Sequence, residues 1–292
     1  MNLSTRNLIA WAVVTAALPV AASAGTLSVG FSHPVGNGSC ITPSNVSSSI
    51  GPVTDSVSCS QSFPTIGNIQ ADASGTANYG LLQSYVHVVG DASPGVVLEN
   101  TATTTSSMSG DLIFQGPGSQ ATTSLNLDMS GLMSIAPVRN GSASMRLTIT
   151  LGSTTRTAIV GLDETNGGQV LGNNLSLSAP WLTLASAGGA AFTFQTEDFT
   201  VALNTPVTLT ISLTANAFLN SGGEITSDFG HTLTFAKLGN VFTLGSGITV
   251  NGDGIVDNIW TGADTSVPEP ATWSLLVAGL LFATTRACRH RL

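Results

Sequence analysis

Alternation of apolar and polar side chains with a period of two constrains the fold of this chain more than any other feature. It is clearest over 143–151, where one face of an extended segment is wholly apolar and carries Met145, Leu147, Ile149 and Leu151. Segments 207–214 and 232–236 alternate in the same way. Gly152-Ser153 offers a tight turn into a return strand at 154–160. These segments predict half-buried β-strands, because Val, Ile and Thr suit a pleated surface.

Helical periodicity is nearly missing from the sequence outside its two ends. Clusters of Gly, Asn, Ser and Pro interrupt the chain about every ten residues, a spacing typical of a sandwich or barrel. So many strands cannot all leave both faces in water, which favours two stacked sheets. The sequence predicts an all-β, antiparallel, jelly-roll-like β-sandwich ectodomain over 25–266. A further strand is expected at 175–177, and local disorder at 34–62 and 100–109.

The first residues have the layout of a secretory signal. Arg6 precedes an apolar run over 8–18, and Ala22-Ser23-Ala24 stands before Gly25. This order predicts a signal helix within 1–24 and cleavage by signal peptidase between Ala24 and Gly25. A buried N-terminal helix is the alternative interpretation.

The last residues form a second targeting segment. Residues 271–285 are apolar or small and uncharged, and a basic cluster follows with Arg286, Arg289 and Arg291. A helix over 271–285 would rise about 22 Å, short of the ~30 Å hydrocarbon core. Such a marginal span suits a temporary anchor, and the arginines would hold its end in the cytoplasm.

The tripeptide Pro268-Glu269-Pro270, followed by a short apolar helix and a basic end, resembles the PEP-CTERM sorting domain of Gram-negative bacteria. The resemblance covers 267–292, under a tenth of the chain. It implies that an exosortase-type membrane protease or transpeptidase cuts at the tripeptide and passes the ectodomain to the cell surface or extracellular matrix. Ala287, Cys288 and His290 interrupt the basic cluster, which departs from the pattern. An ordinary tail anchor is the alternative.

The body between the two ends is strongly acidic. It holds four basic residues (Arg139, Arg146, Arg156 and Lys237) against 15 acidic ones, a balance of −11. Such a body is repelled by nucleic acid and by anionic lipid heads. Nucleic-acid binding is therefore excluded.

Cysteine usage fits export. Cys40 and Cys59 lie in the body, and an even pair in an oxidising compartment predicts a disulfide. Closing a loop of roughly 20 residues would stabilise the fold by about 3 kcal/mol. Two free thiols are the alternative, while nearby His33 does not complete a tetrahedral metal set.

Catalytic motifs do not occur in the sequence: it has no Gly-x-Ser-x-Gly, no His-Glu-x-x-His and no phosphate-binding glycine loop. His87 falls in an alternating run, which predicts a histidine on a sheet surface with a satisfied ring. Glu164 and Glu197 belong to acid pairs of the kind that glycosidases use, and Trp181 or Trp260 could stack on a sugar. A secreted carbohydrate-active hydrolase is therefore one alternative function.

A calcium loop is the other chemical possibility. Asn251, Asp253, Gly254 and Asp257 match the middle positions of an EF-hand, but Thr249 and Trp260 stand where its end ligands belong. A Gly-rich hairpin explains the same residues.

The leading expectation is an exported, non-catalytic surface or matrix protein that associates with extracellular polysaccharide and needs no cofactor. The hydrolase and a calcium- or glycan-binding module remain the alternatives.

Overall fold

The computed structural model describes residues 26–32, 44–47, 52–63, 67–92, 100–136, 141–186, 189–220, 222–236 and 239–261. The signal segment, the sorting tail and Cys40 lie outside these residues, so the predictions for them stay predictions. Across the described part of the chain, no helix has both the length and the apolar character needed to cross a membrane.

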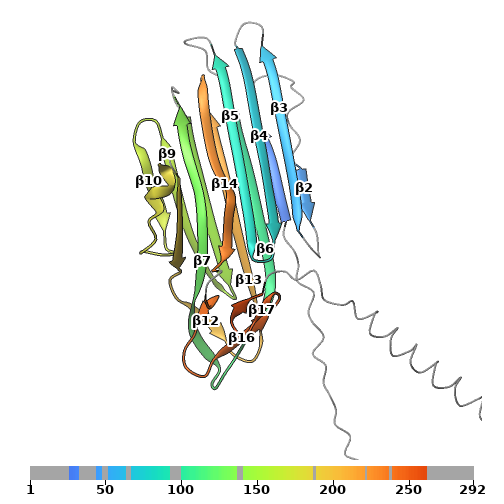
Figure 1. Ribbon diagram of the computed structural model, residues 1–292, viewed down its shortest axis with the longest axis vertical. Helices are drawn as coiled ribbons and strands as arrows, with labels where there is room; N and C mark the ends of the chain where they lie inside the picture. Colours follow the sequence, from blue (N-terminus) through green and yellow to red (C-terminus); the bar gives the residue numbers. More distant parts are fainter. Residues whose placement is uncertain are drawn as a thin grey trace, which may run out of the picture.

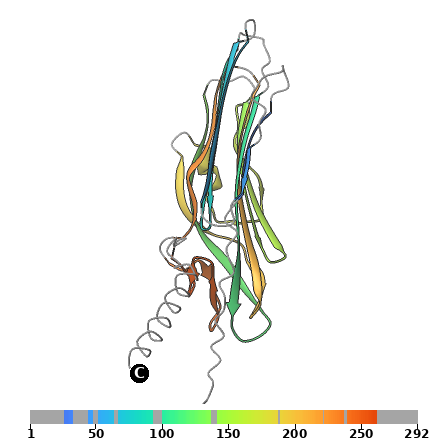
Figure 2. The same ribbon diagram turned by 90° about the vertical axis from the view of Figure 1, so that its right-hand side faces the viewer.

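Strands build two antiparallel sheets that face each other as two layers (Figures 1 and 2). The ten-stranded sheet has the order β10-β9-β8-β13-β6-β16-β17-β18, with β1 also pairing β6 and β2 pairing β1. Its strands are β1 (Thr26–Ser32), β2 (Ser44–Ser47), β6 (Asn100–Gln115), β8 (Gly141–Leu151), β9 (Thr154–Asp163), β10 (Gly167–Asn173), β13 (Pro206–Leu219), β16 (Thr249–Gly252), β17 (Ile255–Val256) and β18 (Ile259–Trp260).

The eight-stranded sheet has the order β11-β7-β14-β5-β4-β3, and β12 and β15 also pair with β7. Its strands are β3 (Val53–Phe63), β4 (Gly67–Asn78), β5 (Leu81–Ala92), β7 (Gln120–Ala136), β11 (Ala190–Gln195), β12 (Phe199–Ala202), β14 (Gly223–Phe235) and β15 (Phe242–Thr243). The longest strand, β7, has 17 residues and so spans about 56 Å. The predicted all-β fold with antiparallel sheets is confirmed.

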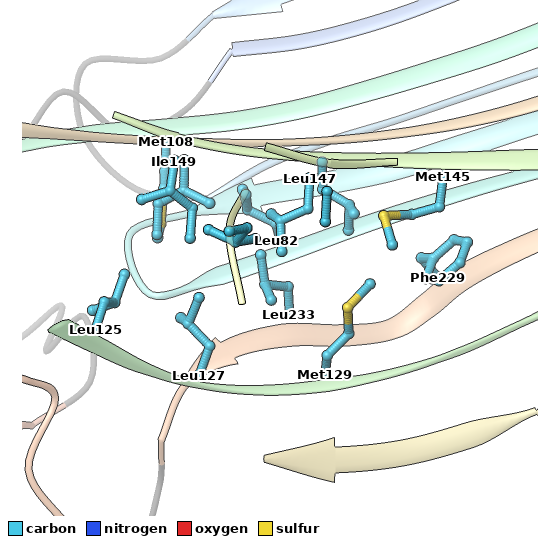
Figure 3. Packing of buried hydrophobic residues seen from close by; sticks show 14 of the residues in the cluster. Leu82, Met108, Leu125, Leu127, Met129, Met145, Leu147, Ile149, Phe229 and Leu233 are labelled. Carbon is cyan, nitrogen blue, oxygen red and sulfur yellow. The ribbon is translucent and has the colours of Figure 1, made fainter. Parts of the chain in front are cut away.

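The core fills the space between the inner faces of the two sheets (Figure 3). The apolar face predicted on β8 is confirmed, because its four side chains are each 0% exposed: Met145, Leu147, Ile149 and Leu151. Leu209, Ile211 and Leu213 of β13 and Leu233 of β14 are buried in the same way. The predicted turn at Gly152 is also confirmed, with φ 59°. Alternation thus identified the inward faces correctly.

Two local predictions are wrong. Residues 100–109 are ordered in β6, and parts of 34–62 belong to β2 and β3. Residues 175–177 form no strand, because Asn173 Oδ1 accepts hydrogen bonds from the backbone N–H groups of Leu175 and Ser176. This side chain bends the chain locally and leads it into the 3₁₀ turn η1 (Trp181–Ala185).

Cys59 on β3 is disulfide-bonded, and its pairing with Cys40 stays a prediction. We expect Cys59→Ser to lower the free energy of unfolding by about 3 kcal/mol, because the closed loop no longer restricts the unfolded chain. Urea denaturation of the full-length chain measures this, with Cys288→Ser as the neutral control. If Cys40→Ser kept the full stability of the parent while Cys59→Ser lost stability, Cys59 would have a partner other than Cys40.

Candidate functional site

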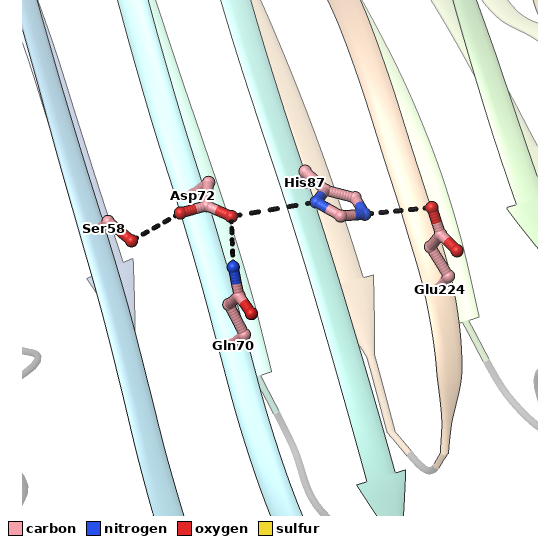
Figure 4. Close-up of polar contacts among 5 residues, drawn as sticks. All are labelled: Ser58, Gln70, Asp72, His87 and Glu224. Carbon is pink, nitrogen blue, oxygen red and sulfur yellow. Dashed lines mark hydrogen bonds and ion pairs between the residues drawn. The ribbon is translucent and has the colours of Figure 1, made fainter.

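A polar network crosses four neighbouring strands on the outer face of the eight-stranded sheet (Figure 4). Strand register places Ser58 of β3, Asp72 of β4 and His87 of β5 directly opposite one another. Glu224 of β14 lies diagonally, since its own partner on β5 is Val89. Strand pairing alone therefore assembles residues that are up to 166 positions apart in the chain.

His87 is the centre of this network. Its Nε2 lies 3.1 Å from Glu224 Oε1, and its Nδ1 lies 3.8 Å from Asp72 Oδ2. Ser58 donates a hydrogen bond to Asp72 Oδ1 at 2.5 Å, and Gln70 Nε2 donates to Asp72 Oδ2 at 3.0 Å. The His87 and Asp72 side chains are 21% and 28% exposed, so both are reachable from solvent. The prediction that His87 is a sheet-surface histidine with a satisfied ring is confirmed.

The order of these groups decides which chemistry they can perform. A serine nucleophile needs an imidazole that takes its proton. Ser58 instead donates to the carboxylate of Asp72, and both ring nitrogens of His87 face carboxylates. The network therefore holds donors and acceptors for binding, and it lacks the serine–imidazole contact of a hydrolase.

Tyr85 extends the network along β5. Its ring centroid lies 6.4 Å from that of His87. Burial raises the pKa of the Tyr85 hydroxyl, and the negative charges of Asp228, Asp72 and Glu224 raise it further. Asp228 lies directly opposite Tyr85 on β14, and all three carboxylates act electrostatically on this partly exposed side chain.

Glu164 and Glu197, the acids considered for a hydrolase, do not form a catalytic pair. Arg156 near the start of β9 donates a hydrogen bond to the carbonyl oxygen of Asp198, the residue after Glu197. Glu164 follows Asp163, the last residue of β9. Arg156 stands seven residues before Asp163 on this strand, which places the two about 23 Å apart. The two carboxylates therefore cannot share one glycosidic bond.

The two tryptophans considered as sugar platforms pack against the protein instead. Trp181 is 3% exposed, and its Nε1 donates to the Ser176 carbonyl oxygen at 3.0 Å. The indole of Trp260 lies against Gly80, where an added Cβ would come 2.5 Å from the indole Nε1. The ring centroid of Trp260 lies 6.0 Å from that of Phe235. Both side chains pack on the protein itself.

The segment proposed as a calcium loop forms two successive hairpins, β16–β17 and β17–β18. Asn251 Oδ1 accepts a hydrogen bond from the Asp257 backbone N–H at 2.9 Å, so this oxygen serves the hairpin. Gly254, Asp257 and Asn258 have positive φ, as the turns require. Among the described residues, no group of three or more His, Cys, Asp and Glu side chains is placed to hold a metal ion. Calcium binding here stays a prediction.

Asp253 lies instead beside Asp111. Burial raises the pKa of the Asp253 carboxyl, and repulsion from Asp111 raises it further. The native state then holds this proton more tightly than the unfolded chain, so the stabilisation from protonated Asp253 is lost as the pH rises through the folded pKa.

We therefore expect Asp253→Asn to be more stable than the parent at pH 7, by less than about 1 kcal/mol because the group is partly exposed. The difference should vanish near pH 3, where the parent carboxyl is also neutral. Urea denaturation at both pH values measures it, with Asp257→Asn as the control. An equal gain at both pH values would contradict the electrostatic cause.

No protein-family model matches the chain, and comparisons with curated proteins and with solved structures find no match either.

Proposed function

We propose that this chain is an exported, non-catalytic protein of the cell surface or extracellular matrix, sorted through its tail at 267–292. The observation that carries the proposal is on the outer face of the ten-stranded sheet, where five pairs of hydroxyl groups line β6, β13, β8 and β9. Cross-strand contacts of 2.9–3.4 Å join Thr105 to Thr214, Ser107 to Ser212, Ser109 to Thr210, Thr148 to Thr157, and Thr150 to Thr155.

These hydroxyl rows give the face a hydrophilic surface with little charge. A hydroxyl has one donor and two acceptor positions, so each pair uses one donor and leaves the other for water or a glycan. Two long hydrogen-bonded sheets with such a face suit a protein that functions outside the cell. Hydrolysis by Glu164 and Glu197 has no support, since these two acids are far apart.

The targeting steps of the proposal come from the two ends of the chain. Signal peptidase would remove 1–24 after export, and the ectodomain over 25–266 would then stay anchored by the apolar helix in 267–292. An exosortase-type enzyme would cut at Pro268-Glu269-Pro270 and release the ectodomain into a polysaccharide-rich layer. The arginines at 286, 289 and 291 would hold the tail in place until that cut.

Replacing the tripeptide by three alanines tests the sorting step. In a Gram-negative host that carries an exosortase, we expect the parent in the surface or medium fraction. The variant should accumulate severalfold in the inner membrane, because the enzyme no longer finds its cleavage site. Fractionation and immunoblotting measure this, with Thr265→Ala/Ser266→Ala as the adjacent control. Equal sorting of parent and alanine variant would contradict the proposal.

A further inference from the structure

Charge is divided unequally between the two sheets. The strands of the ten-stranded sheet carry two basic and two acidic residues: Arg146, Arg156, Asp111 and Asp163. The strands of the eight-stranded sheet carry six acidic residues and no Lys or Arg. Five of these six have a buried residue on at least one side in their strand and so point outward, namely Asp72, Asp91, Asp128, Glu224 and Asp228. We call the surface that they define the acidic face.

The acidic face is suited to a positively charged partner rich in hydroxyl groups. Tyr85 lies on this face directly opposite Asp228, and the negative charges of Asp72 and Glu224 also act on its hydroxyl. Protein interfaces bury an apolar centre. The large apolar side chains that are exposed in the described part of the chain all lie off the eight-stranded sheet: Ile113, Val170, Leu171, Leu177, Leu182, Val256 and Ile259.

A hollow on the same face offers room for a ligand. It has a volume of about 340 Å³ and is lined by Asp128, Ser130, Thr193 and Thr234, among others. This volume falls at the small end of ligand pockets, and a single sugar ring needs no more. Strand register places Asp128 directly opposite both Thr193 and Thr234, and Thr193 donates a hydrogen bond to Asp128 Oδ1.

Thr234 is the unusual member of this hollow. It is 3% exposed, and its Oγ1 is buried without a hydrogen-bond partner in the described structure. A buried hydroxyl in this condition costs about 1–3 kcal/mol, and a ligand that shifts the rim of the hollow to reach Oγ1 would recover that cost.

We propose that the acidic face binds a cationic polysaccharide built from amino sugars with free ammonium groups. The ammonium groups pair with Asp72, Glu224 and Asp228, one sugar ring packs on Tyr85, and another occupies the hollow beside Asp128. An acidic polysaccharide is repelled by the same charges. This inference names the partner of the matrix role proposed above and rests on that role.

Calorimetric titration of the full-length chain in non-ionic detergent tests the inference. The probes are a glucosamine hexamer and its fully N-acetylated counterpart, which has the same rings without the charges. At about pH 5.5 both the ammonium groups and the carboxylates are charged. We expect the glucosamine hexamer to bind at least about tenfold more tightly, and to weaken as salt screens the charges.

Three variants locate the site. Asp228→Asn should weaken binding of the glucosamine hexamer by roughly threefold to tenfold, because it removes one charge from the face. Asp257→Asn removes the same charge from the β17–β18 turn of the other sheet and should leave binding unchanged. Thr234→Val should weaken binding while raising the thermal midpoint, since it removes the unpartnered hydroxyl. A merely structural effect would move stability and binding in the same direction.

Equal binding of the two hexamers, no binding, or an equal loss in Asp257→Asn would each overturn the inference. A lysine hexapeptide that binds as tightly as the glucosamine hexamer would also overturn it, in favour of a basic protein segment. Binding is measured on purified protein and does not depend on sorting. A chain that is sorted but does not bind therefore refutes only the inference, whereas a chain that binds but is not exported refutes only the proposed function.

Discussion

Replacing Phe229 by alanine is expected to lower the free energy of unfolding by about 3–5 kcal/mol. The side chain is 0% exposed and lies between the two sheets, near Met145 (Figure 3). It packs over Gly131 of β7, where an added Cβ would come 2.3 Å from the Phe229 ring. Sheet backbone bounds this space and cannot move inward, so the truncated side chain leaves a cavity.

Urea denaturation of the full-length chain measures the loss. The matched control is Thr226→Ala, which changes an outward-facing residue of the same strand and should cost less than about 1 kcal/mol. A Phe229→Ala variant that loses no more than this control would contradict the packing between the two sheets.

Asn258→Ala is the second substitution with a large expected effect, about 4 kcal/mol. Asn258 is 7% exposed, and its side chain binds both backbone groups of Phe242. Its Oδ1 accepts the Phe242 N–H at 2.8 Å, and its Nδ2 donates to the Phe242 carbonyl oxygen at 2.7 Å. Alanine would leave two buried polar groups without partners, at about 1–3 kcal/mol each. It would also stand at φ 66°, which alanine disfavours.

A graded series checks this cause by the same denaturation experiment. Asn258→Asp keeps an acceptor for the Phe242 N–H but loses the donor to its carbonyl oxygen, so its stability should fall between those of the parent and Asn258→Ala. An aspartate variant weaker than the alanine variant would contradict the role of these two hydrogen bonds.

The alternation of β8 was sufficient to predict its buried face, because one side of a strand that packs on another sheet must be apolar along its whole length. The polar strand β6 could not be predicted in this way. Thr104 and Ser106 face inward on it and donate hydrogen bonds to the carbonyl oxygens of Tyr85 and Gln83 on the opposite sheet. These partners come from tertiary structure, so the local sequence resembled a disordered stretch.

In the candidate site, too, some features follow from the local sequence and others only from tertiary structure. Sequence placed His87 correctly on an outer face, since that depends only on its neighbours along the strand. Its partners Asp72 and Glu224 depend on the pairing of β4, β5 and β14, which no local pattern contains. The contact of Asn258 with Phe242 likewise follows from the packing of β15 and not from a local pattern. Glu164 and Glu197 were candidates by residue type alone, and strand length keeps them apart.

The central claim is that the chain is exported and then released from its C-terminal tail. Intact-mass measurement of the protein recovered from the surface or medium fraction tests this claim most directly. We expect a mature chain that begins at Gly25 and ends near Pro268–Pro270. An intact chain that still ends at Leu292 and remains in the inner membrane would contradict it.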